Sequence, residues 1–250
     1  GRYSSNSTSN LAPDAVQGFV EATLAMTRRI AADPHRHLPD PSLYGPAPGV
    51  ELDLYDPGVD ALQMPRREQL VARVEQAARA AGDAVLSVTS SLTTSGSESL
   101  QVHSNGYRGQ RAATSFVLGA SVTARDEGDR RPEDGWWTVA RHLEDLPAAD
   151  EIGREAARRA LDRLGAGKVA SAAMPLVVEN RAAGRLIGAL LAPLGGAALQ
   201  QGRSCFEGRR GERIGSELLS LRDDPFVPRG LGSRTYDGEG LAARELPVIT

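Results

Sequence analysis

The most regular alternation of apolar and polar residues lies in residues 115–125, where nearly every second side chain is apolar. A period of two is typical of an antiparallel strand with one buried face and one exposed face. The positions predicted to face the core are Phe116, Leu118, Ala120, Val122 and Ala124. This strand is therefore the predicted centre of a half-buried sheet.

Turn signals and further apolar runs on both sides of this strand predict a four-stranded antiparallel meander. Asn105-Gly106 favours a two-residue turn, because both residue types tolerate positive φ angles. Another turn is expected at residues 94–97, and the polar residues 126–129 predict a solvated loop. The predicted strands cover residues 85–92, 98–103, 115–125 and 136–143.

Apolar residues at a spacing of three and four predict three helices, and a dense run of small and apolar residues predicts a fourth. We expect Asp150 to cap the third helix and Gly165 to end it, while Pro193 should break the fourth. Helices packed on one face of an antiparallel meander give an α+β fold. The predicted helices cover residues 14–30, 68–81, 150–164 and 181–201.

The remaining stretches are less regular. Residues 33–65 are rich in proline and predict a loop, with a short edge strand at 50–57 that Pro57 ends. A short buried strand is expected at residues 174–178.

A change in composition predicts two domains. Residues 1–168 are expected to form an N-terminal α+β domain that lacks its first part. Residues 169–250 are expected to be the beginning of a second, truncated α+β domain. Because both ends of the chain fall beside apparent strands, we expect it to be part of a longer protein.

Composition and charge narrow the class of protein. Hydrophobic residues make up 40% of the chain and charged residues 24%, which is ordinary for a soluble protein. The net charge of -3 argues against nucleic acid as a partner, because phosphate binding favours a basic surface. The single cysteine, Cys205, fits a reducing compartment. With no signal peptide and no apolar run of membrane-spanning length, we expect a cytoplasmic protein without a membrane partner.

Few residues point to chemistry by themselves. His35 and His37 are two positions apart, but zinc sites need three or four ligands, so a solvated pair is the favoured interpretation. Cys205 lacks a local nucleophile signature and is interpreted as a structural thiol. Asp237 and Glu239 lie in a compact polar turn that is either structural or part of a site. A hydrolase that uses Cys205 or this carboxylate pair is the weaker alternative.

Several short motifs, taken in order, resemble the family that contains the TldD and TldE (PmbA) proteins, once called modulators of DNA gyrase. The most specific of them is Asp237-Gly238-Glu239-Gly240. The others are Ser104-Asn105-Gly106 with Gly109, Val139-Ala140-Arg141 with Asp145-Leu146, Gly153 with Ala156, Arg158-Arg159-Ala160-Leu161 and Arg163-Leu164, Pro175-Leu176-Val177-Val178, and Gly215-Ser216. The resemblance covers nearly the whole chain and implies the middle portion of a typical member.

The resemblance implies a two-subunit cytoplasmic peptidase that acts on small or unfolded peptides. One subunit of such a pair binds zinc through a His-Glu-x-x-x-His helix, in which the glutamate can act as a general base. In this sequence Gly188 and Pro193 stand at the two histidine positions, and Ala189 stands at the glutamate position. The chain therefore resembles the TldE-like subunit, with no metal of its own and with zinc expected in a TldD-like partner.

The expected function is thus that of a non-catalytic subunit, with a peptide as substrate of the complex. Its expected partner is a TldD-like peptidase in a heterodimer, or a second copy in a homodimer. A stand-alone regulatory protein of the gyrase-modulator type is the alternative, although the negative net charge argues against direct DNA contact. Residues 181–201 are expected to lie at or beneath the partner contact, so Ala192→Glu should weaken assembly or folding and a change at Ala47 should not.

Overall fold

The structure is a computed structural model that describes residues 1–45 and 50–249. Ala47, which lies in the expected proline-rich loop, falls outside the described residues. Within the described ranges, no helix combines the length and the apolar character needed to cross a bilayer.

The chain divides into two compact units. One comprises Gly1–Leu164 together with Asp223–Leu246, and the other comprises residues 165–222 together with 247–249. Most of the fully buried side chains belong to the first unit.

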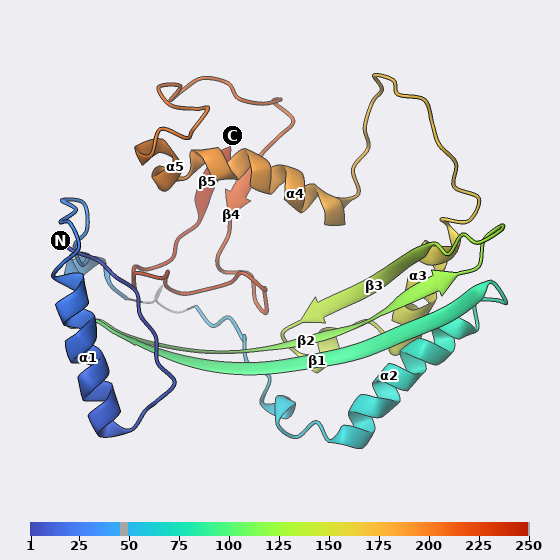
Figure 1. Ribbon diagram of the computed structural model, residues 1–250, viewed down its shortest axis with the longest axis horizontal. Helices are drawn as coiled ribbons and strands as arrows, with labels where there is room; N and C mark the ends of the chain where they lie inside the picture. Colours follow the sequence, from blue (N-terminus) through green and yellow to red (C-terminus); the bar gives the residue numbers. More distant parts are fainter. Residues whose placement is uncertain (46–49, 250) are drawn as a thin grey trace. The chain divides into compact units, whose positions relative to one another are not determined.

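Three antiparallel strands form the sheet of the first unit, in the order β1-β2-β3 (Figure 1). β1 spans Val85–Val102, β2 spans Arg108–Ala124 and β3 spans Glu133–Ala140. β3 pairs only with residues 116–123 of β2, so the far half of β1 and β2 is a two-stranded ribbon. The alternation predicted for β2 is confirmed, because its five inward positions are 0–1% exposed.

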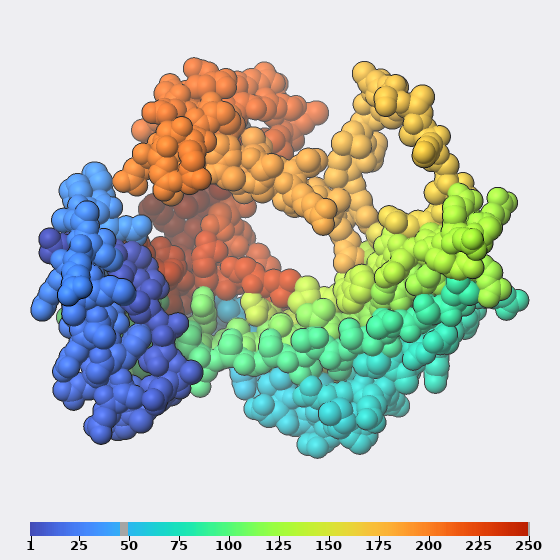
Figure 2. Space-filling model, in the orientation of Figure 1, coloured from blue at the N-terminus to red at the C-terminus, as the bar shows by residue number. Residues whose placement is uncertain are grey.

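Two helices pack against one face of this sheet, as the sequence predicted. α2 spans Met64–Arg79 and α3 spans Ala149–Leu161. In Figure 2 the side chains of α2, in cyan, pack against the green band of β1 and β2. The predicted α+β fold is confirmed. The shared core consists of Val74, Ala78, Val88, Leu118, Ala120, Val122, Ala149, Ile152, Ala156, Ala157 and Ala160.

The two helices approach each other closely at one glycine. A Cβ atom added at Gly153 of α3 would lie 2.2 Å from the carbonyl oxygen of Val74 and 3.0 Å from the backbone nitrogen of Ala78. Both atoms belong to the backbone of α2 and cannot swing aside. The absence of a side chain at Gly153 therefore sets the distance between α2 and α3.

The predicted four-stranded meander is wrong in one respect: the first two predicted strands form a single continuous strand, β1. Residues 94–97 continue β1 instead of turning, and Gly96 lies opposite Thr114 of β2. Gly96 does not adopt a positive φ angle. Serine and threonine are compatible with a solvated ribbon as well as with a turn, so composition alone could not separate the two.

The predicted two-residue turn at Asn105-Gly106 is also wrong. The N–H of His103 donates to the oxygen of Tyr107 at 3.0 Å, which leaves a three-residue loop between them. Gly106 has φ 102°, but Asn105 does not adopt a positive φ. The Asn105 side chain instead donates from Nδ2 to the oxygen of Pro39 at 2.9 Å.

The start of α3 differs from the prediction as well. The residue that caps α3 is Ala148, and it provides no side-chain hydrogen bond. Asp150 lies inside the helix, where it accepts two hydrogen bonds from Arg73 of α2, at 3.1 and 2.6 Å. The carboxylate therefore ties the two helices together instead of capping one. Gly165 has φ 70° and follows the last turn, as expected.

The expected edge strand at residues 50–57 does not form. The segment still contacts β2 outside any regular strand pairing: the oxygen of Leu54 accepts a hydrogen bond from the N–H of Thr114 at 2.9 Å. A short 3-10 turn, η2, follows at Pro57–Val59. The other elements of this unit are α1 at Pro13–Thr27, which confirms the first predicted helix, η1 at Pro41–Leu43 and η3 at Leu143–Asp145.

The second unit consists of short helices and irregular chain. α4 spans Asn180–Leu191, η4 spans Ala192–Leu194 and α5 spans Gly196–Gln200, so the predicted break at Pro193 is confirmed. The buried strand expected at residues 174–178 is wrong: these residues form no strand, and Val177 is 95% exposed. A small two-stranded sheet pairs β4, Leu221–Asp223, with β5, Leu246–Ile249.

Candidate functional site

The three positions aligned with the zinc motif lie on the helical segment of the second unit. Gly188 and Ala189 are in α4, and Pro193 is in η4. A Cβ atom at Gly188 would meet nothing within 4 Å, so the fold leaves room for a larger side chain there. None of the three residues has a side-chain atom that can bind a metal. Within the described part of the chain, no group of three histidine, cysteine, aspartate or glutamate residues could hold a metal ion.

The histidines and the cysteine lie apart from these positions. His35 and His37 are exposed, and no histidine follows His142 in the sequence. His103 contacts Tyr44, with 3.1 Å between its Nδ1 and the tyrosine hydroxyl. Cys205 is exposed, which does not fit the structural thiol expected from the sequence.

The turn that contains Asp237 and Glu239 has a structural basis. Asp237 Oδ1 accepts hydrogen bonds from the backbone N–H groups of Glu239, at 2.8 Å, and Leu241, at 3.0 Å. Gly240 has φ 84°, and a Cβ atom there would lie 2.6 Å from the ring of Tyr107. The aspartate therefore holds the turn closed while the glycine lets it pack against Tyr107. The Glu239 side chain is exposed.

An aromatic cluster lies beneath this turn, and the sequence did not predict it. The rings of Tyr44, His103 and Tyr107 lie 4.8–5.5 Å apart, centre to centre, and the ring of Tyr236 lies 5.8 Å from that of Tyr107. The Tyr107 hydroxyl is buried and has no hydrogen-bond partner among the described residues. Burial raises the pKa of Tyr107, and the neighbouring Tyr236 raises it further. The residues come from three distant segments, so no local pattern could have indicated the cluster.

A charged junction joins residues 53, 142 and 229 of the first unit. Arg229 donates to Asp53 Oδ2 at 2.6 Å and to Glu144 Oε1 at 2.7 Å. His142 Nε2 lies 3.1 Å from Asp53 Oδ1. The Arg229 hydrogen bond lowers the pKa of Asp53. Asp53 and Arg229 have positive φ angles of 49° and 55°, which are uncommon for residues other than glycine.

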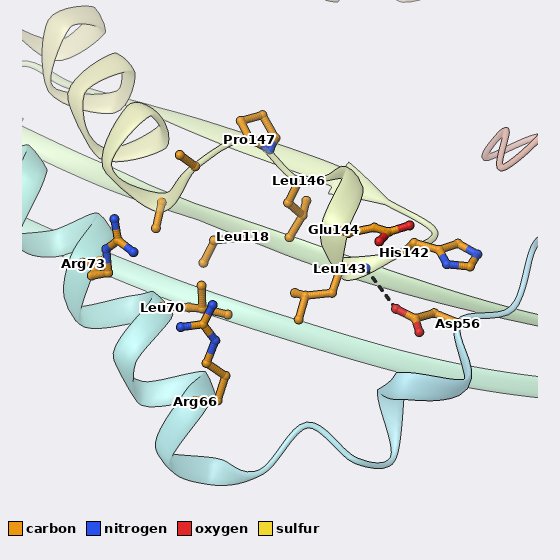
Figure 3. Close-up of a pocket in the computed structure, with 12 residues that line it drawn as sticks. Asp56, Arg66, Leu70, Arg73, Leu118, His142, Leu143, Glu144, Leu146 and Pro147 are labelled. Carbon is orange, nitrogen blue, oxygen red and sulfur yellow. Dashed lines mark hydrogen bonds between the residues drawn. The ribbon is translucent and has the colours of Figure 1, made fainter.

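This junction borders a cavity of about 500 Å³ between α2 and residues 142–149 (Figure 3). Its apolar lining comprises Leu70, Leu118, Leu143, Leu146, Pro147, Ala148 and Ala149. Its polar lining comprises Asp56, Arg66, Arg73, His142 and Glu144. A cleft of this size that combines apolar side chains with convergent polar groups is the usual form of a small-molecule site. The sequence signalled none of these residues as functional.

Asp56 is fixed at one end of the cavity. Its Oδ2 accepts the N–H of Leu143 at 3.0 Å, and its Oδ1 accepts the N–H of Gly58 at 2.8 Å. Burial raises the pKa of Asp56, but these backbone hydrogen bonds lower it, and the net shift is downward. Asp56 is therefore a carboxylate at neutral pH.

Comparison with known proteins assigns this fold to a class of metallopeptidase domains. The sequence model of the PmbA/TldA metallopeptidase central domain matches residues 58–164, and that of the PmbA/TldA metallopeptidase C-terminal domain matches residues 171–250. The chain belongs to the PmbA/TldD family.

Individual relatives agree with this assignment. The chain is 28% identical to the metalloprotease PmbA of Escherichia coli O157:H7, over 99% of its own length and 54% of the relative. It is 25% identical to a PmbA homologue of Haemophilus influenzae, over 97% of its own length and 53% of the relative. The chain thus spans about half the length of the curated relatives it matches.

Solved structures show the same fold. A Bacteroides thetaiotaomicron protein named as a modulator of DNA gyrase has a TM-score of 0.93 and 32% identity, and the match covers 100% of this chain and 57% of that protein. TldE from Thermococcus kodakarensis has a TM-score of 0.68 over 95% of this chain and 53% of that protein. At 20% identity, the second likeness concerns the fold alone.

Proposed function

We propose that this chain is part of a TldE-like, non-catalytic subunit of a two-subunit cytoplasmic zinc peptidase that acts on small or unfolded peptides. The observation that carries the proposal is the helical segment with Gly188, Ala189 and Pro193 in place of the histidines and the glutamate of the zinc motif. A Cβ atom at Gly188 has open space, so lack of room does not account for the missing ligand. Zinc would then be held by a TldD-like partner.

The names of the relatives favour two different functions. PmbA of E. coli is called a metalloprotease, which supports a role in proteolysis. The protein from B. thetaiotaomicron is named as a modulator of DNA gyrase, which keeps a stand-alone regulatory protein as the second candidate. The net charge of -3 favours the first, because direct DNA binding requires a basic surface.

Helix α4 is the proposed contact with the partner subunit. Leu186 is 55% exposed on this helix, and an exposed leucine beside other apolar residues favours association. Ala192 is exposed as well, so the loss of folding expected for Ala192→Glu is no longer predicted. An effect on assembly stays a prediction.

Leu186→Glu is expected to weaken co-purification with a TldD-like subunit by at least roughly ten-fold, because the contact would bury an unpaired carboxylate. Its thermal unfolding midpoint should stay unchanged, since Leu186 is exposed in this chain. Leu218→Glu is the control: Leu218 is 96% exposed but lies outside the helix, so assembly should be unaffected. Equal binding by the wild-type protein, Leu186→Glu and Leu218→Glu would show that α4 is not part of the interface. Failure of the wild-type protein to bind any zinc-containing partner would favour the stand-alone function.

A further inference from the structure

We propose that the cavity between α2 and residues 142–149 binds a small aliphatic zwitterion, of which a dipeptide with a branched aliphatic side chain is the best fit. The proposal does not depend on whether this chain assembles with a zinc peptidase, because all the lining residues belong to one compact unit of the chain. It rests on three features of the cavity: its apolar floor, its cationic wall and its acidic end.

The floor is formed by leucines from three separate elements. Leu118 rises from the centre of β2, Leu70 comes from α2, and Leu143 and Leu146 come from η3 and the loop after it (Figure 3). Their side chains point into a common space of about 500 Å³. This space exceeds what one aliphatic side chain fills, and the four leucine side chains offer no polar group to a ligand in contact with them. An aliphatic group is therefore the chemistry that the floor accepts.

The wall is cationic because one stripe of α2 carries two arginines. Arg66 and Arg73 lie on either side of Leu70, at a helical spacing of four and three residues (Figure 3). Arg73 is already neutralised by the two hydrogen bonds to Asp150. Arg66 donates only to the neutral side chain of Gln69, at 2.6 Å, and makes no ion pair with any described residue.

The charge of Arg66 is thus available to an anion. The first turn of α2 contains no acidic residue that could neutralise it. A carboxylate suits this position better than a neutral acceptor, because a charge-assisted hydrogen bond to a guanidinium is about twice as strong as a neutral one.

The opposite end of the cavity carries two carboxylates, one of which is paired with Arg229. Asp56 and Glu144 gather there beside His142, away from the two arginines (Figure 3). Glu144 bonds to Arg229 through Oε1, and Oε2 has no hydrogen bond to another described residue. This oxygen can accept from an ammonium or amide N–H group. A fatty acid has no such donor, whereas a dipeptide has both an ammonium group for Glu144 and a carboxylate for Arg66.

The proposal is tested by calorimetric titration of the purified protein with leucyl-leucine. We expect saturable binding that weakens by at least roughly ten-fold when the ligand is leucyl-leucinamide, which lacks the carboxylate. Arg66→Gln should weaken leucyl-leucine binding to the same extent and leave leucyl-leucinamide binding unchanged. Arg29→Gln is the matched control, since it removes the same charge from an exposed residue outside the cavity.

A second variant tests whether the ligand occupies the cavity, without changing the charge of Arg66. Ala148 is exposed at the rim, so Ala148→Phe should fill the space without removing a core contact, and it should abolish binding while the unfolding midpoint is kept. Three results would overturn the proposal: no binding of leucyl-leucine to the wild-type protein, equal binding of leucyl-leucine and its amide, or octanoate binding as tightly as the dipeptide. None of these results bears on partner assembly or zinc content, so failure here leaves the proposed function untouched.

Discussion

Leu118→Ala is expected to lower the free energy of unfolding by roughly 2–5 kcal/mol, the range for a buried leucine replaced by alanine. Leu118 is 1% exposed at the centre of β2 and packs in the core that α2 and α3 share with the sheet. Removal of most of its side chain would leave a cavity, because the sheet and the two helices around it cannot all move inward to fill the space. The change is measured by urea denaturation followed by circular dichroism.

Ser121→Ala on the other face of β2 is the control. Ser121 is half-buried, and its hydroxyl donates to Glu133 on the exposed side of the sheet. Loss of such a surface hydrogen bond should lower the free energy of unfolding by under about 1 kcal/mol. Equal losses for the two variants would show that the two-face assignment of β2 is incorrect.

Gly153→Ala should destabilise the protein by at least about 1–3 kcal/mol, although alanine is the better helix former. The new methyl group would lie 2.2 Å from the backbone oxygen of Val74, so α2 and α3 would have to move apart. Such a shift would disturb the core on both sides of the contact, including Val74 and Ala78, which are 0% exposed. Thermal unfolding and urea denaturation both report the effect.

Arg154→Ala, at the next residue of α3, is the control for an alanine substitution on the exposed face of the same helix. Arg154 is exposed, and its replacement should change the free energy of unfolding by no more than about 0.5 kcal/mol. If Gly153→Ala proved as stable as Arg154→Ala, the two helices would not be as close as the structure places them.

The elements with strong periodicity were predictable from the sequence, and those with ambiguous composition were not. The alternating apolar residues of β2 and the apolar stripe of α3 were predicted correctly, although not the first residues of either element, because burial of one face dictates the pattern. Residues 94–97 carry only small polar side chains that suit a turn and an exposed ribbon equally. Residues 174–178 are apolar, yet 174–177 are exposed, and nothing local distinguishes the segment from a buried strand.

The candidate sites also differ in how far the sequence alone could indicate them. The proposed absence of zinc ligands at Gly188, Ala189 and Pro193 rests on the sequence alone, because a metal motif depends on residue type at a fixed spacing. The cavity could not be predicted from the sequence, because Arg66 and Glu144 are far apart in the chain and only the folded structure places α2 and η3 around one space. A sequence shows charges along the chain, but it does not show which of them lack a partner after folding.

The measurement that tests the central claim most directly is the zinc content of the purified protein, alone and after assembly with a TldD-like subunit. Elemental analysis should find no stoichiometric zinc in the protein alone, and zinc in the complex should follow the partner. Stoichiometric zinc in the protein alone, lost on replacing His35 or His37, would contradict the account and show that this chain holds a metal site of its own.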